Sequence, residues 1–219
     1  MKNSVLLLML LSLTACGTAQ KVKYSALEKV GIHKRDVLVN RIEETSETQK
    51  ETKEQVKSAY DELASLVTVR DGGLEKRYKR MAKAVEKSED KAEELDERIE
   101  SVDEVAQALF KEWKQELSQY KSATLRRTSE QNLQTTKNRY AKIYQKMQTS
   151  QKRVDPVLKI LQDNTLYLKH NLNARAITSI SSEVLTIEQD VAALIMQMES
   201  SISDSQSFIQ SMRTAKDSS

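Results

Sequence analysis

The residue types that most often perform catalysis or bind metals are few in this chain, and their spacing fits no such site. The two histidines, His33 and His170, lie far apart, have no cysteine near them and form no HExxH pattern. Glu183 and Glu188 are five residues apart, which is not the one-face spacing of a di-metal site in a helical bundle. The sequence also lacks a phosphate-binding loop and a G-x-S-x-G elbow. We therefore expect no enzymatic activity, no cofactor and no metal.

The single cysteine, Cys16, follows an N-terminus that has the pattern of a signal peptide. A short basic region precedes an apolar run over residues 5–13, which is too short to span a bilayer. Small residues come directly before the cysteine, so the segment resembles a bacterial lipobox. The resemblance implies that residues 1–15 are removed and that Cys16 receives a diacylglyceryl thioether on its sulfur and an acyl chain on its new amine. An ordinary secreted protein with a cysteine near its cleavage site is the alternative.

The cysteine count and the residue after Cys16 extend this expectation to a compartment. A single cysteine cannot form an intrachain disulfide, and an unpaired thiol is unusual in an exported protein. Lipidation of Cys16 would account for it. In Gram-negative lipoproteins an Asp after the cysteine commonly means retention in the inner membrane, and this chain has Gly17 there. The sequence thus predicts an outer-membrane lipoprotein that faces the periplasm and contacts the membrane through its lipid.

Basic residues are concentrated in one stretch of a chain whose net charge is only +3. Residues 121–153 contain nine Lys or Arg and one acid, whereas residues 86–104 contain ten acids. One interpretation is that these segments lie side by side and neutralise each other. The other is an anion-binding stripe for anionic lipid, lipopolysaccharide or an acidic partner, with four residues as the candidates: Arg126, Arg127, Arg139 and Lys142. Export would separate the protein from the cytoplasmic nucleic acids, so we expect no nucleic acid as a partner.

A second polar stretch contains His170, Asn171 and Asn173, which are poor residues for the interior of a helix. They could be solvated, or they could form a polar layer that fixes the register of a bundle, as a buried Asn does in coiled coils. A patch that binds a partner or ligand is the alternative. Trp113, the only tryptophan, falls at a heptad position, where packing in the core is the expected role.

The scarcity of turn-forming residues indicates an all-α fold. The 219 residues include four Gly and one Pro, while 31% are charged and 5% aromatic, which argues against sandwiches, barrels and nucleotide-binding α/β folds. Apolar residues at alternating spacings of four and three predict three long helices. Gly72-Gly73 would end the first helix, and Asp155-Pro156 would begin the third. The expected helices cover residues 33–70, 74–153 and 156–214.

Two irregularities in the heptad pattern bear on how these helices pack. The first seam is polar at its centre, at Thr45, Gln49 and Thr52, which indicates one side of a larger bundle. The second seam loses its phase over residues 126–131 without Gly or Pro, which favours a stutter in a continuous helix; a kink or short break is the alternative. We expect an elongated antiparallel three-helix bundle or coiled coil over residues 33–215, preceded by a tether and short helix over 16–32.

Five segments combine distinctive residues: residues 24–36, Glu112-Trp113, Leu125-Arg126-Arg127, Pro156-Val157-Leu158 and residues 168–174. Together with the lipobox, they resemble a family of helical envelope proteins from Gram-negative bacteria that is catalogued as a domain of unknown function. The resemblance covers nearly the whole chain after residue 16 and implies no activity, ligand or catalytic residue.

The sequence as a whole favours a structural function. We expect a lipid-anchored periplasmic rod that acts as a scaffold or binds a protein partner, including a second copy of itself. The alternative is a protein that binds or shapes membranes through the basic stripe of residues 121–153.

Overall fold

The computed structural model describes residues 33–68 and 73–217, and the described part is built from four long helices. These are α2 (Lys34–Thr68), α3 (Leu74–Glu116), α4 (Ala123–His170) and α5 (Ala174–Asp217), with a short 3₁₀ helix, η1 (Leu117–Gln119), after α3. No strand occurs in this part of the chain. The prediction of an elongated all-α bundle is confirmed, but the division into three helices is wrong.

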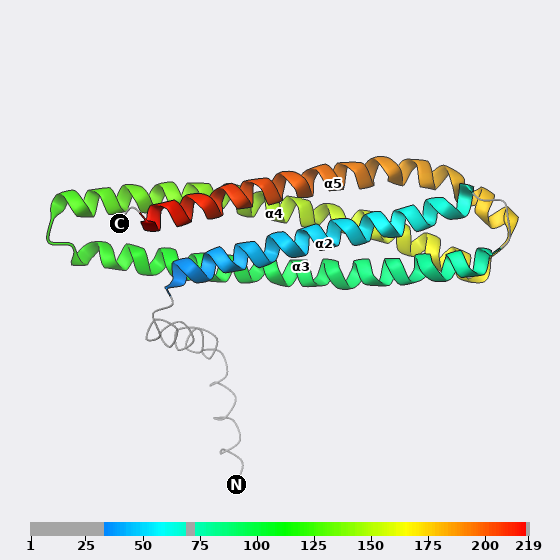
Figure 1. Ribbon diagram of the computed structural model, residues 1–219, viewed down its shortest axis with the longest axis horizontal. Helices are drawn as coiled ribbons and strands as arrows, with labels where there is room; N and C mark the ends of the chain where they lie inside the picture. Colours follow the sequence, from blue (N-terminus) through cyan, green and yellow to red (C-terminus); the bar gives the residue numbers. More distant parts are fainter. Residues whose placement is uncertain (1–32, 69–72, 218–219) are drawn as a thin grey trace, which may run out of the picture.

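Each helix packs against two neighbours, in the cyclic order α2, α3, α4, α5 and back to α2 (Figure 1). Successive helices run in opposite directions, which gives an up-down-up-down four-helix bundle. With a rise of 1.5 Å per residue, the 48 residues of α4 extend over about 72 Å. The expected tether, the short helix over 16–32 and Cys16 lie outside the described residues.

The first difference from the predicted helices is a break between α3 and α4. Instead of a stutter over 126–131, the chain turns at residues 117–122, where Tyr120 has an extended backbone (φ −67°, ψ 124°). Ser122 then caps α4, because its hydroxyl accepts a hydrogen bond from the backbone N–H of Leu125 at 3.4 Å. This turn contains neither Gly nor Pro, which is why the composition did not indicate it.

The second difference concerns Pro156, which lies inside α4 and does not begin a helix. Its side chain is exposed, whereas Val154, Val157 and Leu158 around it are buried in the bundle. Their continuous apolar face keeps the helix intact through the proline. The chain instead turns at residues 171–173, and α5 follows from Ala174 to Asp217 rather than from 156 to 214.

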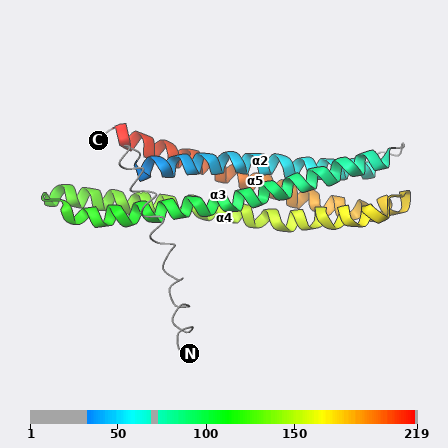
Figure 2. The ribbon, with the colours of Figure 1, turned by 90° about the horizontal axis from the view of Figure 1, so that it is seen from below.

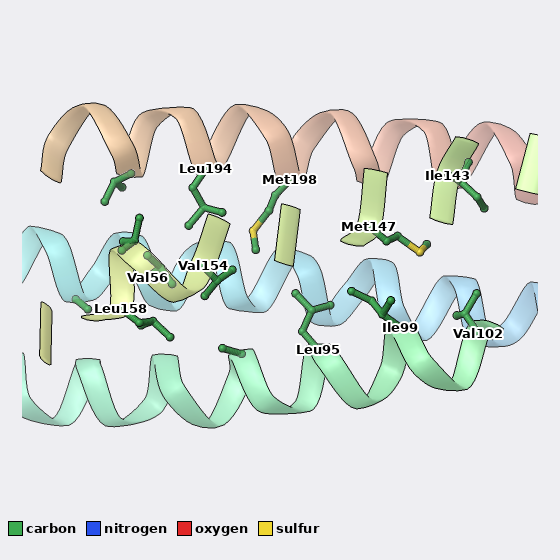
Figure 3. Close-up of a cluster of buried hydrophobic side chains, with 14 of the residues drawn as sticks. Val56, Leu95, Ile99, Val102, Ile143, Met147, Val154, Leu158, Leu194 and Met198 are labelled. Atoms are coloured by element: carbon green, nitrogen blue, oxygen red, sulfur yellow. The ribbon is translucent and has the colours of Figure 1, made fainter. Parts of the chain in front are cut away.

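The core is an apolar seam contributed by all four helices, with buried polar residues near its centre (Figure 3). In its central part, Leu95 and Ile99 of α3 face Met147 of α4 and Met198 of α5, and the side chains of all four are at most 3% exposed. The apolar residues of α2 that recur at spacings of three and four also include buried ones: Leu38, Ile42, Val56, Leu63 and Leu66. The spacing of apolar residues therefore identified the buried face of this helix correctly.

The polar centre of α2 is buried as well, and its groups are hydrogen-bonded. Thr45, Gln49 and Thr52 are 0% exposed. The amide of Gln49 donates to Ser150 of α4 at 2.7 Å and to Ser201 of α5 at 3.1 Å. The Thr52 hydroxyl lies 2.8 Å from the carbonyl of Thr48 and 3.1 Å from that of Lys91 in α3. The polar seam thus forms one side of a bundle, as its composition indicated.

The four helices do not end at the same level. The α3–α4 end projects beyond the start of α2 and the end of α5 (Figures 1 and 2). Two contacts mark where the four-helix section ends: Lys34 forms an ion pair with Glu112 at 2.8 Å, and Arg35 donates to the backbone carbonyl of Met212. Beyond the start of α2 and the end of α5 at Asp217, only α3, η1 and α4 continue, and we call this part the projecting end.

Candidate functional site

The basic stretch predicted from the sequence lies along the first part of α4 and includes the projecting end. Its four candidate residues are all exposed, and we call them together the α4 basic surface: Arg126, Arg127, Arg139 and Lys142. No carboxylate in the described part of the chain forms an ion pair with any of them. Lys146 differs, because it pairs with Asp204 of α5 at 2.6 Å. The positive charge of this surface is therefore largely uncompensated within the bundle.

Among the described residues, the acid of the 86–104 stretch that forms ion pairs is Glu94, and its partners Lys91 and Arg98 lie on α3 rather than on α4. Lys91 of α3 forms ion pairs with Glu51 at 2.6 Å and with Glu94 at 2.8 Å. Arg98 pairs with Glu44 at 2.7 Å and with Glu94 at 3.3 Å. The hydrogen bond to Glu51 is the main cause of a raised pKa of Lys91, and the hydrogen bond from Lys91 is the main cause of a lowered pKa of Glu94. These ion pairs therefore do not join the acidic stretch to the basic stretch.

The tyrosines in and next to the basic stretch differ in their surroundings. Tyr140 is 4% exposed, stacks on Tyr144 with ring centroids 5.6 Å apart, and meets the edge of Phe110 at 5.5 Å. Its hydroxyl donates to a carboxylate oxygen of Asp103 at 2.8 Å. Burial, with a smaller contribution from this hydrogen bond, raises the pKa of Tyr140. These rings belong to the α3–α4 interface, whereas Tyr120, at the projecting end, is 42% exposed.

A groove lies where the four-helix section changes to two helices. Its volume is about 750 Å³, and we call it the end groove. One wall is a face of α4 that runs from Leu125 to Arg139, and the ends of α2 and α5 contribute Arg35, Phe208 and Met212. A smaller hollow of about 220 Å³ shares Arg139 and Phe208 with it and extends along α4 to Lys142.

Trp113 lines the end groove, and it also packs against the core as expected. Its indole N–H donates to the hydroxyl of Ser129 at 2.8 Å, so the ring is fixed between α3 and α4. Arg139 and Lys142 lie together along the groove and its extension, whereas Arg126 and Arg127 lie outside both, on the projecting end. The heptad pattern could not reveal the groove, because it depends on where α2 and α5 end relative to α4.

The polar stretch near His170 forms the turn between α4 and α5, at the opposite end of the bundle (Figure 1). The side-chain amide of Asn171 donates to the carbonyl of Tyr167 at 3.0 Å. The side-chain oxygen of Asn173 accepts a hydrogen bond from the backbone N–H of Ala176 at 3.0 Å and so caps α5. His170 is exposed. This stretch is neither a helix interior nor a buried polar layer; that layer is formed by Gln49 and its serine partners.

Within residues 33–68 and 73–217, none of the helices contains a stretch long and apolar enough to cross a lipid bilayer. In the same part of the chain, no three His, Cys, Asp or Glu side chains lie close enough together to hold a metal ion.

The fold and its surfaces define an all-α four-helix-bundle protein with an uncompensated basic surface and a groove at one end. The chain belongs to the DUF2959 family, described as proteins of unknown function, whose family model matches residues 23–212. This match confirms the resemblance to an uncharacterised family. No curated protein and no solved structure matches this chain.

Proposed function

We propose that this protein is a lipid-anchored helical rod of the cell envelope that serves as a scaffold or binds a partner. Cys16 would hold it in the outer membrane, and the bundle would face the periplasm. The main supporting observation is that the α4 basic surface lies toward the end of the bundle where α2 begins. Residues 17–32 separate Cys16 from His33, and even a fully extended chain of this length spans at most about 60 Å. This end of the bundle would therefore stay near the membrane.

A second candidate function is peripheral binding to an anionic membrane, and the composition of the projecting end favours it. Leu125 is 59% exposed and Tyr120 is 42% exposed, and both lie next to basic residues in the sequence. Amphipathic aromatic and basic side chains suit the headgroup region of a membrane, where each basic residue contributes about 1 kcal/mol of attraction to anionic lipid. A lipid anchor together with such a surface would attach the rod at two points.

The anchor is tested by detergent partitioning of the wild-type chain and of Cys16→Ala. We expect the wild type in the detergent-rich phase and the Cys16→Ala chain in the aqueous phase. A Cys16→Ala protein that still partitions with the membrane fraction would contradict lipid anchoring at this residue.

The basic surface is tested by co-sedimentation of the protein with anionic vesicles and, separately, with lipopolysaccharide. The test variant changes Arg126, Arg127, Arg139 and Lys142 to Glu, and we expect it to lose most of the binding. A matched control changes four exposed lysines near the opposite end of α3 to Glu: Lys76, Lys79, Lys83 and Lys87. Equal binding by the two variants would show that the α4 basic surface has no special role.

A further inference from the structure

We propose that the end groove receives an amphipathic helix of a partner protein, with acidic residues along the flanks of that helix. The inference rests on the partner-binding part of the proposed function and gives that partner a chemistry. It is carried by the shape of the groove, by the composition of its walls and by its charge.

The shape argument follows from the levels at which the helices end. Along most of the bundle α4 is covered by α5, and Phe208 and Met212 are the last buried residues of α5 before the groove. The groove follows the face of α4 from Leu125 to Arg139: the end of α5 flanks this face near Arg139, and the face is open toward Leu125 on the projecting end. Fourteen residue steps correspond to about 21 Å, or four helical turns. A helix placed in the groove would lie along this face of α4, beside the end of α5.

The volume of the groove agrees with this occupant. A helix about 10 Å in diameter, rising 1.5 Å per residue, occupies about 120 Å³ per residue. A helix of about 14 residues immersed to half its depth would fill about 800 Å³, compared with about 750 Å³ for the groove. An amphipathic helix binds in a groove of another protein through its apolar face.

The walls combine apolar anchors with small polar side chains. Trp113 and Leu125 offer apolar surface, while Thr128, Asn132 and Thr135 form a polar row along α4. An acyl chain laid on this row would leave hydroxyl and amide groups facing hydrocarbon, which is unfavourable. A helix can meet the same row with its own polar flank. The composition therefore favours a peptide helix over a lipid tail.

The charge of the groove favours an acidic partner. Arg35 and Arg139 line it, Lys142 lines its extension, and the lining of the main groove includes no acid. Asp204 borders the extension, but it is paired with Lys146 at 2.6 Å. Two copies of this chain meeting at their projecting ends would bring Arg126 and Arg127 toward the same residues of the other copy, and like charges disfavour that contact.

The single tryptophan makes the groove observable, because Trp113 lies in its wall. The purified full chain is titrated with a designed peptide of about 16 residues that carries Leu on one helical face and Glu on its flanks. The control peptide has Lys in place of each Glu. We expect the acidic peptide to shift the emission of Trp113 in a saturable way and the basic peptide to leave it unchanged.

Two matched substitutions locate the binding site. Arg139→Glu lies in the groove, whereas Arg127→Glu makes the same change in charge outside it. We expect Arg139→Glu to weaken binding of the acidic peptide at least about tenfold and Arg127→Glu to weaken it less than about threefold. Thr128→Tyr, at an exposed position, fills the groove and should also abolish binding.

Several results would overturn the inference. These are an unchanged Trp113 emission with the acidic peptide, an equal response to both peptides, or equal effects of the two arginine substitutions. If vesicles of brominated phosphatidylglycerol quench the emission of Trp113 and the peptide leaves it unchanged, the groove is a lipid site. If light scattering shows a dimer that is lost in Thr128→Tyr, the occupant is a second copy. Vesicle co-sedimentation is scored separately, so loss of membrane binding alone would contradict the membrane function and leave the groove inference standing.

Discussion

The side-chain amide of Gln49 donates a hydrogen bond to the hydroxyl of Ser150 across 2.7 Å, although 101 residues separate them in the chain. The same amide reaches Ser201, so one glutamine of α2 joins α4 and α5 at the centre of the bundle. Because Gln49, Ser150 and Ser201 are all 0% exposed, a shift of any of these helices along its axis would leave buried polar groups without partners.

We predict that Gln49→Leu destabilises the bundle less than Gln49→Ala does. Both substitutions remove the partner of the Ser201 hydroxyl, while the Ser150 hydroxyl keeps its bond to the carbonyl of Met147 at 2.7 Å. Leu, unlike Ala, fills most of the space of the Gln49 side chain. Gln49→Ala leaves a void beside the two serines. Its free energy of unfolding should be lower than that of Gln49→Leu by about 1–3 kcal/mol. Urea unfolding measures both variants. Equal losses in the two would mean that the hydrogen bonds, and not the filling of the layer, determine the stability here.

We predict that Pro156→Ala stabilises the protein. Pro156 lies inside α4, where it has no N–H to donate to the carbonyl of Lys152 and where its ring crowds that carbonyl. Its side chain is exposed, so alanine removes little packing. The gain should be about 1–2 kcal/mol after the greater freedom of the unfolded chain is subtracted. Thermal unfolding measures it, and a lower melting temperature in Pro156→Ala would contradict this account.

We predict that Asn173→Ala weakens the start of α5. The side-chain oxygen of Asn173 accepts the N–H of Ala176 at 3.0 Å, and loss of such a cap costs about 1 kcal/mol. Asn173→Asp retains the acceptor and serves as the matched control. Hydrogen exchange of the first turn of α5 should accelerate in Asn173→Ala and stay near the wild-type rate in Asn173→Asp. Unchanged exchange in both variants would show that the cap contributes nothing.

We predict a loss of stability at high pH that depends on Tyr140. Burial raises its pKa above the ordinary value of 10.0, so the folded state disfavours ionisation of this side chain. The associated stabilisation is complete below pH 10 and is lost as the pH rises above that value, because the unfolded chain then releases a proton that the folded chain retains.

The Tyr140→Phe variant tests this sign. It should be less stable near neutral pH by about 0.5–1.5 kcal/mol, because the hydrogen bond to Asp103 is removed. Above pH 10 its stability should fall less steeply than that of the wild type. Urea unfolding at several alkaline pH values measures the slopes, and parallel slopes would contradict the role of Tyr140. Exposed Tyr120→Phe is the control.

The sequence by itself determined the helical class and the buried faces. Few glycines and a regular three-four spacing leave long amphipathic helices as the way to bury apolar side chains, and Leu38, Ile42 and Leu63 are buried for that reason. The polar centre at Gln49 correctly indicated a larger bundle, because such a seam is weak without further partners.

The tertiary structure alone decided where the helices end and what their ends form. Asp155-Pro156 is typical of a helix start, but the packing of Val157 and Leu158 keeps α4 continuous there. The chain turns instead at 117–122 and 171–173, where Ser122 and Asn173 cap the following helices, and such caps are weak signals in a sequence. Whether Arg139 meets an acid depends on which helix lies beside it, and periodicity does not specify that neighbour. The end groove exists because α2 and α5 stop before α3 and α4 do, which is a relationship between segments far apart in the chain.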